Sequence, residues 1–169
     1  ANEEITELYN AGVVRGKTKS LFAPDESITR AELAQLIYSA FNPINRSGEY
    51  LIYDNPSSEW YNRAVTAVLK GKIMMGKADG QFKPNDLLTR EELAKVLVTV
   101  YELEKGTIVP AEDFCGDESK ISDWAFSYVA KAYTAEIMKG MDNGEFMPQN
   151  TTTRAETAVA IKRLMDMMK

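Results

Sequence analysis

Apolar residues recur with helical spacing in three long stretches of the chain. The positions are Leu33, Leu36, Ile37, Ala40 and Phe41; Leu93, Val96, Leu97, Val100 and Tyr101; and Thr157, Ala160, Ile161, Leu164 and Met165. The i, i+3, i+4, i+7, i+8 spacing places each set on one face of an amphipathic helix. Since no unit of this size hides its apolar face alone, three such faces predict a central three-helix bundle.

Each of these helices is opened by the same pattern, Thr-Arg-x-Glu, at residues 29–32, 89–92 and 153–156. A Thr at the N-cap accepts from the backbone N–H of the third helical residue, and a Glu there reaches back to the N-cap N–H. We therefore predict helix starts at Thr29, Thr89 and Thr153. The Arg falls on the first helical residue, where a cation is mildly unfavourable against the helix dipole, so stability does not explain its recurrence.

A shorter helix is predicted upstream of each long one. Its apolar positions are Ile5, Leu8 and Tyr9; Val65, Val68 and Leu69; and Val129, Ala132 and Tyr133. The connecting loops carry Asp79-Gly80 and Asn143-Gly144, which are typical of turns with positive φ. The first loop has Lys19-Ser20 instead, and we expect it to be the least regular of the three.

The similarity extends beyond the helices to a fixed frame. In every copy the Arg lies 14 residues after a Gly, 8 after a Phe and 6 after a Pro. These residues are Gly16, Gly76 and Gly140; Phe22, Phe82 and Phe146; and Pro24, Pro84 and Pro148. The chain is therefore predicted to be a single compact, mainly α domain, 1–169, built from three helix-loop-helix repeats: 1–42, 54–104 and 117–169.

The first repeat is predicted to be incomplete at its N-terminal end. Trp60 and Trp124 stand 16 residues before the Gly of their repeats, so the matching position falls just before Ala1. Asp54 precedes Trp60, and either Asp117 or Asp123 is its counterpart before Trp124. The extra length at 42–59 and 104–122 is rich in Gly, Pro, Ser and charge, which predicts surface connectors.

Composition excludes several classes of function. The formal net charge of −5, with both signs interspersed, argues against a nucleic-acid surface. No apolar run reaches the roughly 18 residues of a membrane helix, so we expect a soluble chain whose secretion signal, if any, lies outside it. Without His, and with Cys115 as the only cysteine, we predict no catalytic residue, metal ligand or cofactor, and therefore no enzyme.

The segment Val13-Val14-Arg15-Gly16, with Phe22, Pro24 and Ile28 to Glu32, resembles the S-layer homology (SLH) module, and the pattern recurs in phase at 73–92 and 137–156. The resemblance implies a pseudo-threefold body with one helix per module in the central bundle. It also implies grooves between modules that hold secondary cell wall polysaccharide, often through a pyruvate ketal. The expected setting is the bacterial cell surface or S-layer, with the module fused or attached to a larger surface protein.

In that family the Arg of the quartet meets the pyruvyl carboxylate and the Gly admits the sugar. The resemblance therefore implies ligand-binding roles for Arg30, Arg90, Arg154, Gly16, Gly76 and Gly140. A guanidinium pairs a carboxylate through two parallel hydrogen bonds, and unpaired N–H groups of the first helical turn would add to the anion site. Trp60, Trp124, Tyr61 and Phe126 are candidates to stack against sugar rings.

Other interpretations of these residues stay open. The Gly residues could serve positive-φ turns alone, the Trp residues could pack between helices, and the Arg residues could be solvated surface charges. The whole chain could equally be a protein-interaction scaffold whose partners dock on the connectors.

Overall fold

The computed structural model describes residues 2–18, 21–42, 48–112 and 114–169. The helices are α1 (Asn2–Asn10), α2 (Arg30–Phe41), α3 (Asn62–Lys70), α4 (Arg90–Lys105), α5 (Phe126–Thr134) and α6 (Arg154–Met167), with a short 3-10 helix, η2 (Glu118–Lys120). No β-strand occurs in the described part, so the predicted mainly α class is confirmed. The loop expected to be least regular, at Lys19-Ser20, lies outside the described residues.

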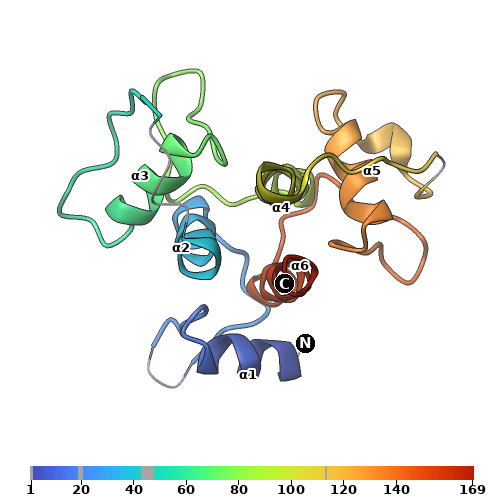
Figure 1. The fold of residues 1–169 in the computed structure, drawn as a ribbon, viewed down its shortest axis with the longest axis horizontal. Helices are drawn as coiled ribbons and strands as arrows, with labels where there is room; N and C mark the ends of the chain where they lie inside the picture. The colour runs from blue at the N-terminus through green and yellow to red at the C-terminus, as the bar shows by residue number, and fades with distance from the viewer. Residues whose placement is uncertain (1, 19–20, 43–47, 113) are drawn as a thin grey trace.

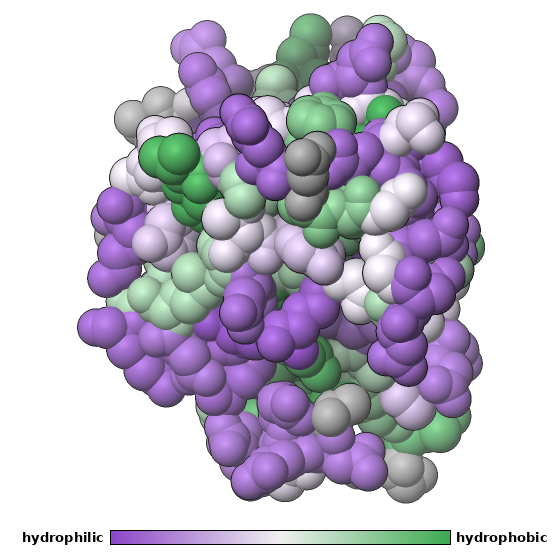
Figure 2. Space-filling model, turned by 90° about the vertical axis from the view of Figure 1, so that its right-hand side faces the viewer, coloured by the Kyte–Doolittle hydropathy of each residue, from purple (hydrophilic) through white to green (hydrophobic). Residues whose placement is uncertain are grey.

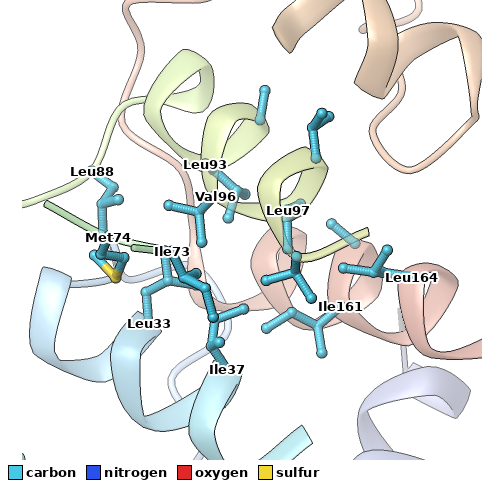
Figure 3. Packing of buried hydrophobic residues seen from close by; sticks show 14 of the residues in the cluster. Leu33, Ile37, Ile73, Met74, Leu88, Leu93, Val96, Leu97, Ile161 and Leu164 are labelled. Carbon is cyan, nitrogen blue, oxygen red and sulfur yellow. The ribbon is translucent and has the colours of Figure 1, made fainter. Parts of the chain in front are cut away.

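The three long helices form the centre of the molecule. Figure 1 shows α2, α4 and α6 nearly end-on around the middle, with α1, α3 and α5 outside them. Side chains from all three long helices meet in one core (Figure 3), and Leu33, Leu93 and Ile161 there are fully buried. The amphipathic stripes in the sequence therefore do form a shared core.

Each outer helix packs against the long helix of a different repeat. Helix α3 packs on α2, α5 packs on α4, and α1 packs on α6. The packed helix pair is thus not the helix-loop-helix unit seen in the sequence, because each loop crosses to the centre before its second helix begins. The contact between α1 and α6 joins the first repeat to the last and closes a ring (Figure 1).

A ring of backbone hydrogen bonds lies where the three long helices begin. The N–H of Ile28 donates to Thr152 O at 3.0 Å, that of Thr152 to Leu88 O at 3.0 Å, and that of Leu88 to Ile28 O at 3.3 Å. All three residues are fully buried. Each repeat is therefore bonded to both others through its main chain, directly before its N-cap Thr.

The predicted helix starts are confirmed, with a complete capping box at Thr29, Thr89 and Thr153. The expectation of unpaired N–H groups in the first turn is wrong. Arg30 N–H donates to Asp86 O and Ala31 N–H to Pro84 O, each at 2.9 Å, and the same two bonds recur at the other two long helices. The loop of the next repeat thus supplies carbonyls that accept hydrogen bonds from the first two N–H groups of each long helix. These N–H groups are therefore not free to bind an anion.

The two segments predicted as surface connectors are only partly at the surface. Phe114, Asp117 and Ile121 of the second segment are buried. Phe114 packs against Phe126 and Tyr133 of the outer helix α5. In the described residues no helix is long and apolar enough to cross a membrane. Figure 2 shows one face of the molecule on which hydrophilic residues predominate and hydrophobic ones form small groups between them.

Two aspartates hold the loops that lead to the long helices. Asp54 accepts hydrogen bonds from the N–H groups of Phe82 and Lys83 at 2.6 and 2.7 Å. Asp117 accepts from Phe146 and Met147 at 2.6 and 2.9 Å. The counterpart of Asp54 is therefore Asp117, not Asp123, and the irregular spacing to Trp124 is absorbed by the turn of η2.

The central ring predicts that two neighbouring leucines contribute very differently to the free energy of unfolding. Replacing the fully buried Leu88 by Ala should lower the free energy of unfolding by about 3 kcal/mol, because it leaves a cavity beside the ring. Leu87→Ala is the matched control, since Leu87 is 49% exposed, and should change stability little. Urea denaturation measures both, and equal effects would contradict the importance of this centre.

Asp117 predicts a pH dependence of stability. Burial alone would raise its pKa, but the hydrogen bonds from the Phe146 and Met147 N–H groups and from Cys115, together with the charge of Lys120, outweigh burial and lower it. A carboxylate with a depressed pKa stabilises the fold above its unfolded pKa of about 4, and this stability is lost as the pH falls through the folded value. Asp117→Asn should therefore cost about 1–3 kcal/mol at pH 7 and progressively less in acid.

Urea denaturation between pH 7 and pH 3 measures this difference. The control is Asp123→Asn at the exposed neighbouring aspartate, which should leave the pH profile unchanged. A constant difference between wild type and Asp117→Asn across this range would show that Asp117 does not act through its charge.

Candidate functional site

Three grooves each contain one of the recurrent Arg residues. The Arg30 groove, of about 180 Å³, is lined in part by Arg30, Gly76, Lys77, Glu92, Lys95 and Trp124. The Arg154 groove, of about 590 Å³, is lined in part by Arg15, Gly16, Lys17, Glu32, Trp60 and Arg154. The Arg90 groove, of about 350 Å³, is lined in part by Glu4, Arg90, Lys139, Gly140, Glu156 and Arg163.

The grooves combine predicted residues from different repeats. In the Arg30 groove the Arg comes from the first repeat, Gly76 from the second and Trp124 from the third. In the Arg154 groove the Arg comes from the third repeat, Gly16 from the first and Trp60 from the second. The sequence gives each residue type at a fixed spacing, but only the closed ring brings these copies together.

The Arg side chains are buried, with exposed fractions of 6% for Arg30, 4% for Arg90 and 8% for Arg154. Arg90 donates through Nε to Phe146 O at 2.7 Å and through Nη2 to Lys139 O at 2.9 Å. Its guanidinium carbon lies 4.9 Å from the centre of the Phe146 ring. The same Nε and Nη2 bonds and the same ring contact join Arg30 to the second repeat and Arg154 to the first.

Each Arg therefore clamps its own helix start to the loop of the next repeat. The interpretation as a solvated surface charge is wrong, and so is the expectation that stability does not explain this residue. The guanidinium donates to two loop carbonyls in a buried or part-buried setting, which would lose these donors without it. Burial lowers the pKa of Arg30 and Arg90, while Glu92 beside Arg30 and Glu156 beside Arg90 oppose that shift.

Two of the recurrent glycines, Gly16 and Gly140, are required by close approach of the backbone, whereas a Cβ on Gly76 would meet the Ile52 side chain first. Gly80 and Gly144 have the expected positive φ, 76° and 82°, but Gly16, Gly76 and Gly140 do not, so positive φ does not explain these three. A Cβ on Gly140 would lie 3.0 Å from Glu145 O, and one on Gly16 would lie 2.7 Å from Leu21 O. The glycine lets the loop fold back on itself, which shapes the groove wall.

The two tryptophans are exposed at the groove edges. Trp60 is 61% exposed and Trp124 is 49% exposed, so packing between helices does not account for either. Lys95 Nζ lies 5.4 Å from the centre of the Trp124 ring. Tyr61 is buried, and Phe126 packs edge-on against Phe114 at 5.6 Å, so these two are poorer stacking candidates.

The carboxylates of the capping boxes are also groove residues, although their sequence pattern predicts helix capping alone. Glu156 pairs with Arg90 at 3.0 Å and Glu32 pairs with Arg154 at 2.9 Å. The spacing of the quartet predicts the capping role of the Glu, but its ion pair depends on an Arg from another repeat. Elsewhere in the described residues, no group of three His, Cys, Asp or Glu side chains could hold a metal ion.

The family comparison matches residues 1–34, 54–94 and 116–158, over half of the chain, to the S-layer homology domain. The chain belongs to the S-layer homology family. Its three matched segments coincide with the three repeats, each of which contributes one Arg to the grooves.

Similar proteins carry this domain as a part of larger chains. The SLH chain is 33% identical to the Surface-layer 125 kDa protein of Lysinibacillus sphaericus, over 98% of this chain and 14% of that protein. It is 33% identical to an Endoglucanase of Bacillus sp. (strain KSM-635), over 95% of this chain and 17% of that protein. It is 29% identical to the Cellulosome-anchoring protein of Acetivibrio thermocellus, over 93% of this chain and 36% of that protein.

The chain thus spans between 9% and 17% of the length of the first four relatives, and the similarity to enzymes covers their SLH regions only. The family and these relatives identify a module that anchors proteins at the bacterial cell surface.

Removing the clamp formed by Arg90 should cause a large loss of stability. Arg90→Ala should lower the free energy of unfolding by about 3–5 kcal/mol, because it leaves Glu156 unpaired and two loop carbonyls without donors. Arg15→Ala is the control, since the Arg15 side chain is exposed and should contribute little. Thermal and urea denaturation measure both, and a small effect at Arg90 would show that the clamp is dispensable.

Proposed function

We propose that this SLH module is a non-catalytic anchor that binds secondary cell wall polysaccharide carrying an acidic, pyruvyl-type substituent. The polymer occupies the grooves between repeats, and the module tethers a larger surface protein to the wall. The observation that carries this proposal is the presence of an exposed Trp and a fixed guanidinium in the same groove, at Trp124 with Arg30 and at Trp60 with Arg154.

The chemistry of these grooves suits an acidic sugar. A Trp face offers apolar area to the C–H groups of a pyranose ring, and a guanidinium held by two carbonyls stays oriented toward the groove. Basic residues beside each Arg, such as Arg15 and Lys95, add positive charge although the whole chain carries −5. The charge needed to bind an anion is thus concentrated in the grooves.

Several grooves on one body suit a polymer better than a small molecule. If two or three of them engage one strand, each further contact is intramolecular, and avidity exceeds that of one groove by about 10²–10⁴. The alternative function, a scaffold for protein partners, places binding on the connectors at 42–59 and 104–122. The two hypotheses differ in whether the Trp residues of the grooves matter.

Trp→Ala variants test the proposal better than Arg→Ala variants, since the Arg side chains also hold the fold. Trp60→Ala and Trp124→Ala should each weaken binding to purified wall sacculi by roughly threefold to tenfold, and the double variant should weaken it further. Sacculi stripped of their secondary polymer should bind no variant. Co-sedimentation over a range of protein concentrations gives the affinities.

Tyr9→Ala is the matched control, because Tyr9 is an aromatic residue 58% exposed that lines none of the three grooves. It should bind as wild type does. Equal binding of the wild-type protein to stripped and intact sacculi would overturn the glycan proposal. Full retention of binding by the double Trp variant would favour the scaffold.

A further inference from the structure

The three grooves differ in the partner of the Nη1 group of their Arg. In the Arg154 and Arg90 grooves this nitrogen donates to Glu32 and Glu156, at 2.9 and 3.0 Å. In the Arg30 groove the corresponding Glu92 pairs with Lys77 instead, at 3.0 Å. Arg30 has its two carbonyl bonds through Nε and Nη2, and its Nη1 has no partner among the described residues.

The sequence explains why Glu92 forms its ion pair with Lys77 and leaves Arg30 without a direct bond, although its charge still acts on Arg30. The position of Lys77 is occupied by Met141 in the third repeat, so Glu156 has no lysine there to compete for it. The first repeat has Lys17 at this position, but Lys17 pairs with Glu26. The residues matching Glu26 are Asp86 and Asn150, and the shorter Asp86 forms no ion pair with Lys77 in the described structure.

The unpaired nitrogen of Arg30 is not completely enclosed. Among the described residues, Asn55 Oδ1 is the one fully buried side-chain polar atom without a partner, so Nη1 keeps some exposed surface, and Arg30 lines the groove. An incoming carboxylate can accept from Nη1 without displacing a protein group. In the other two grooves the same carboxylate must first compete with a glutamate for the guanidinium, which weakens its net binding.

We propose that the Arg30 groove is the highest-affinity site of this module for an acidic sugar substituent, and that the Arg154 and Arg90 grooves are internally neutralised by their capping-box glutamates. This inference rests on the proposed function and adds a ranking of the grooves to it. Lys77 is the residue that sets the ranking, because it withdraws Glu92 from Arg30.

The other walls of the Arg30 groove fit a single acid-bearing sugar. Trp124 lies at its edge with Lys95 beside the ring, so an apolar face and a second cation flank Arg30. At about 180 Å³ it is smaller than the Arg154 groove of about 590 Å³. The smaller volume favours a single sugar that carries the acidic group and disfavours a longer segment of polysaccharide.

The two tryptophans of the chain make the ranking measurable, because each reports on a different groove. The intact chain, labelled with ¹⁵N, is titrated with a methyl glycoside of a 4,6-O-pyruvylated amino sugar, and the two indole N–H signals are followed by NMR. Trp60→Phe and Trp124→Phe assign the signals. We expect the Trp124 signal to reach half-saturation at a concentration about tenfold lower than the Trp60 signal.

Glutamine variants of the capping glutamates test the cause. Glu32→Gln keeps an acceptor for the N-cap N–H of Thr29 but removes the charge that neutralises Arg154, so the Trp60 response should move to roughly tenfold lower concentration. Glu92→Gln is the matched control at the same helix position and should shift the Trp124 response much less. Lys77→Met, which copies Met141, should weaken the Trp124 response more than Lys17→Met weakens that of Trp60.

The outcomes separate the two proposals. If neither indole signal responds to the pyruvylated sugar, the proposed function fails. If both respond but Trp60 saturates first or together with Trp124, binding stands and the ranking is overturned. If Glu32→Gln leaves the Trp60 response unchanged although its thermal stability matches wild type, neutralisation by the glutamate is not the cause.

Discussion

Three main-chain hydrogen bonds at the centre, linking Ile28, Thr152 and Leu88 in a cycle, are the constraint on which the rest of the structure depends. They fix the three N-cap threonines side by side, so each long helix starts against the loop of the next repeat. That loop supplies the carbonyls for the first helical turn and for the guanidinium. The capping box of each helix is local, but because none of these carbonyl partners is local in sequence, no repeat can complete its first helical turn or its groove alone.

The recurrent Arg illustrates how one side chain serves architecture and recognition together. A guanidinium has donors on three nitrogens, and in every repeat the Nε and Nη2 donors satisfy carbonyls of the neighbouring loop. Only Nη1 is left to vary, and it faces either a glutamate or the groove. A buried, oriented cation is costly to build for binding alone, whereas here the fold already requires it.

The sequence predicted the local features well and the features that depend on closure poorly. Capping boxes at Thr29, Thr89 and Thr153 involve residues three positions apart, so their pattern is readable along the chain. The pairing of Arg154 with Glu32 spans 122 positions and depends on the first repeat meeting the last. The choice between Asp117 and Asp123 likewise required the position of the Phe146 loop. Chemical type and spacing identified the candidate residues, but which copies share a groove follows from three-dimensional packing.

The seam between α1 and α6 has a mechanical consequence. Helix α1, near the N-terminal end of the chain, packs against α6, near its C-terminal end, so a pull between the two ends would separate α1 from α6 and load that contact before the rest of the ring. The Arg154 clamp crosses the same seam through Phe22 and Arg15. Under tension the Arg154 groove would therefore open before the Arg30 groove, which is built around α2 and α4.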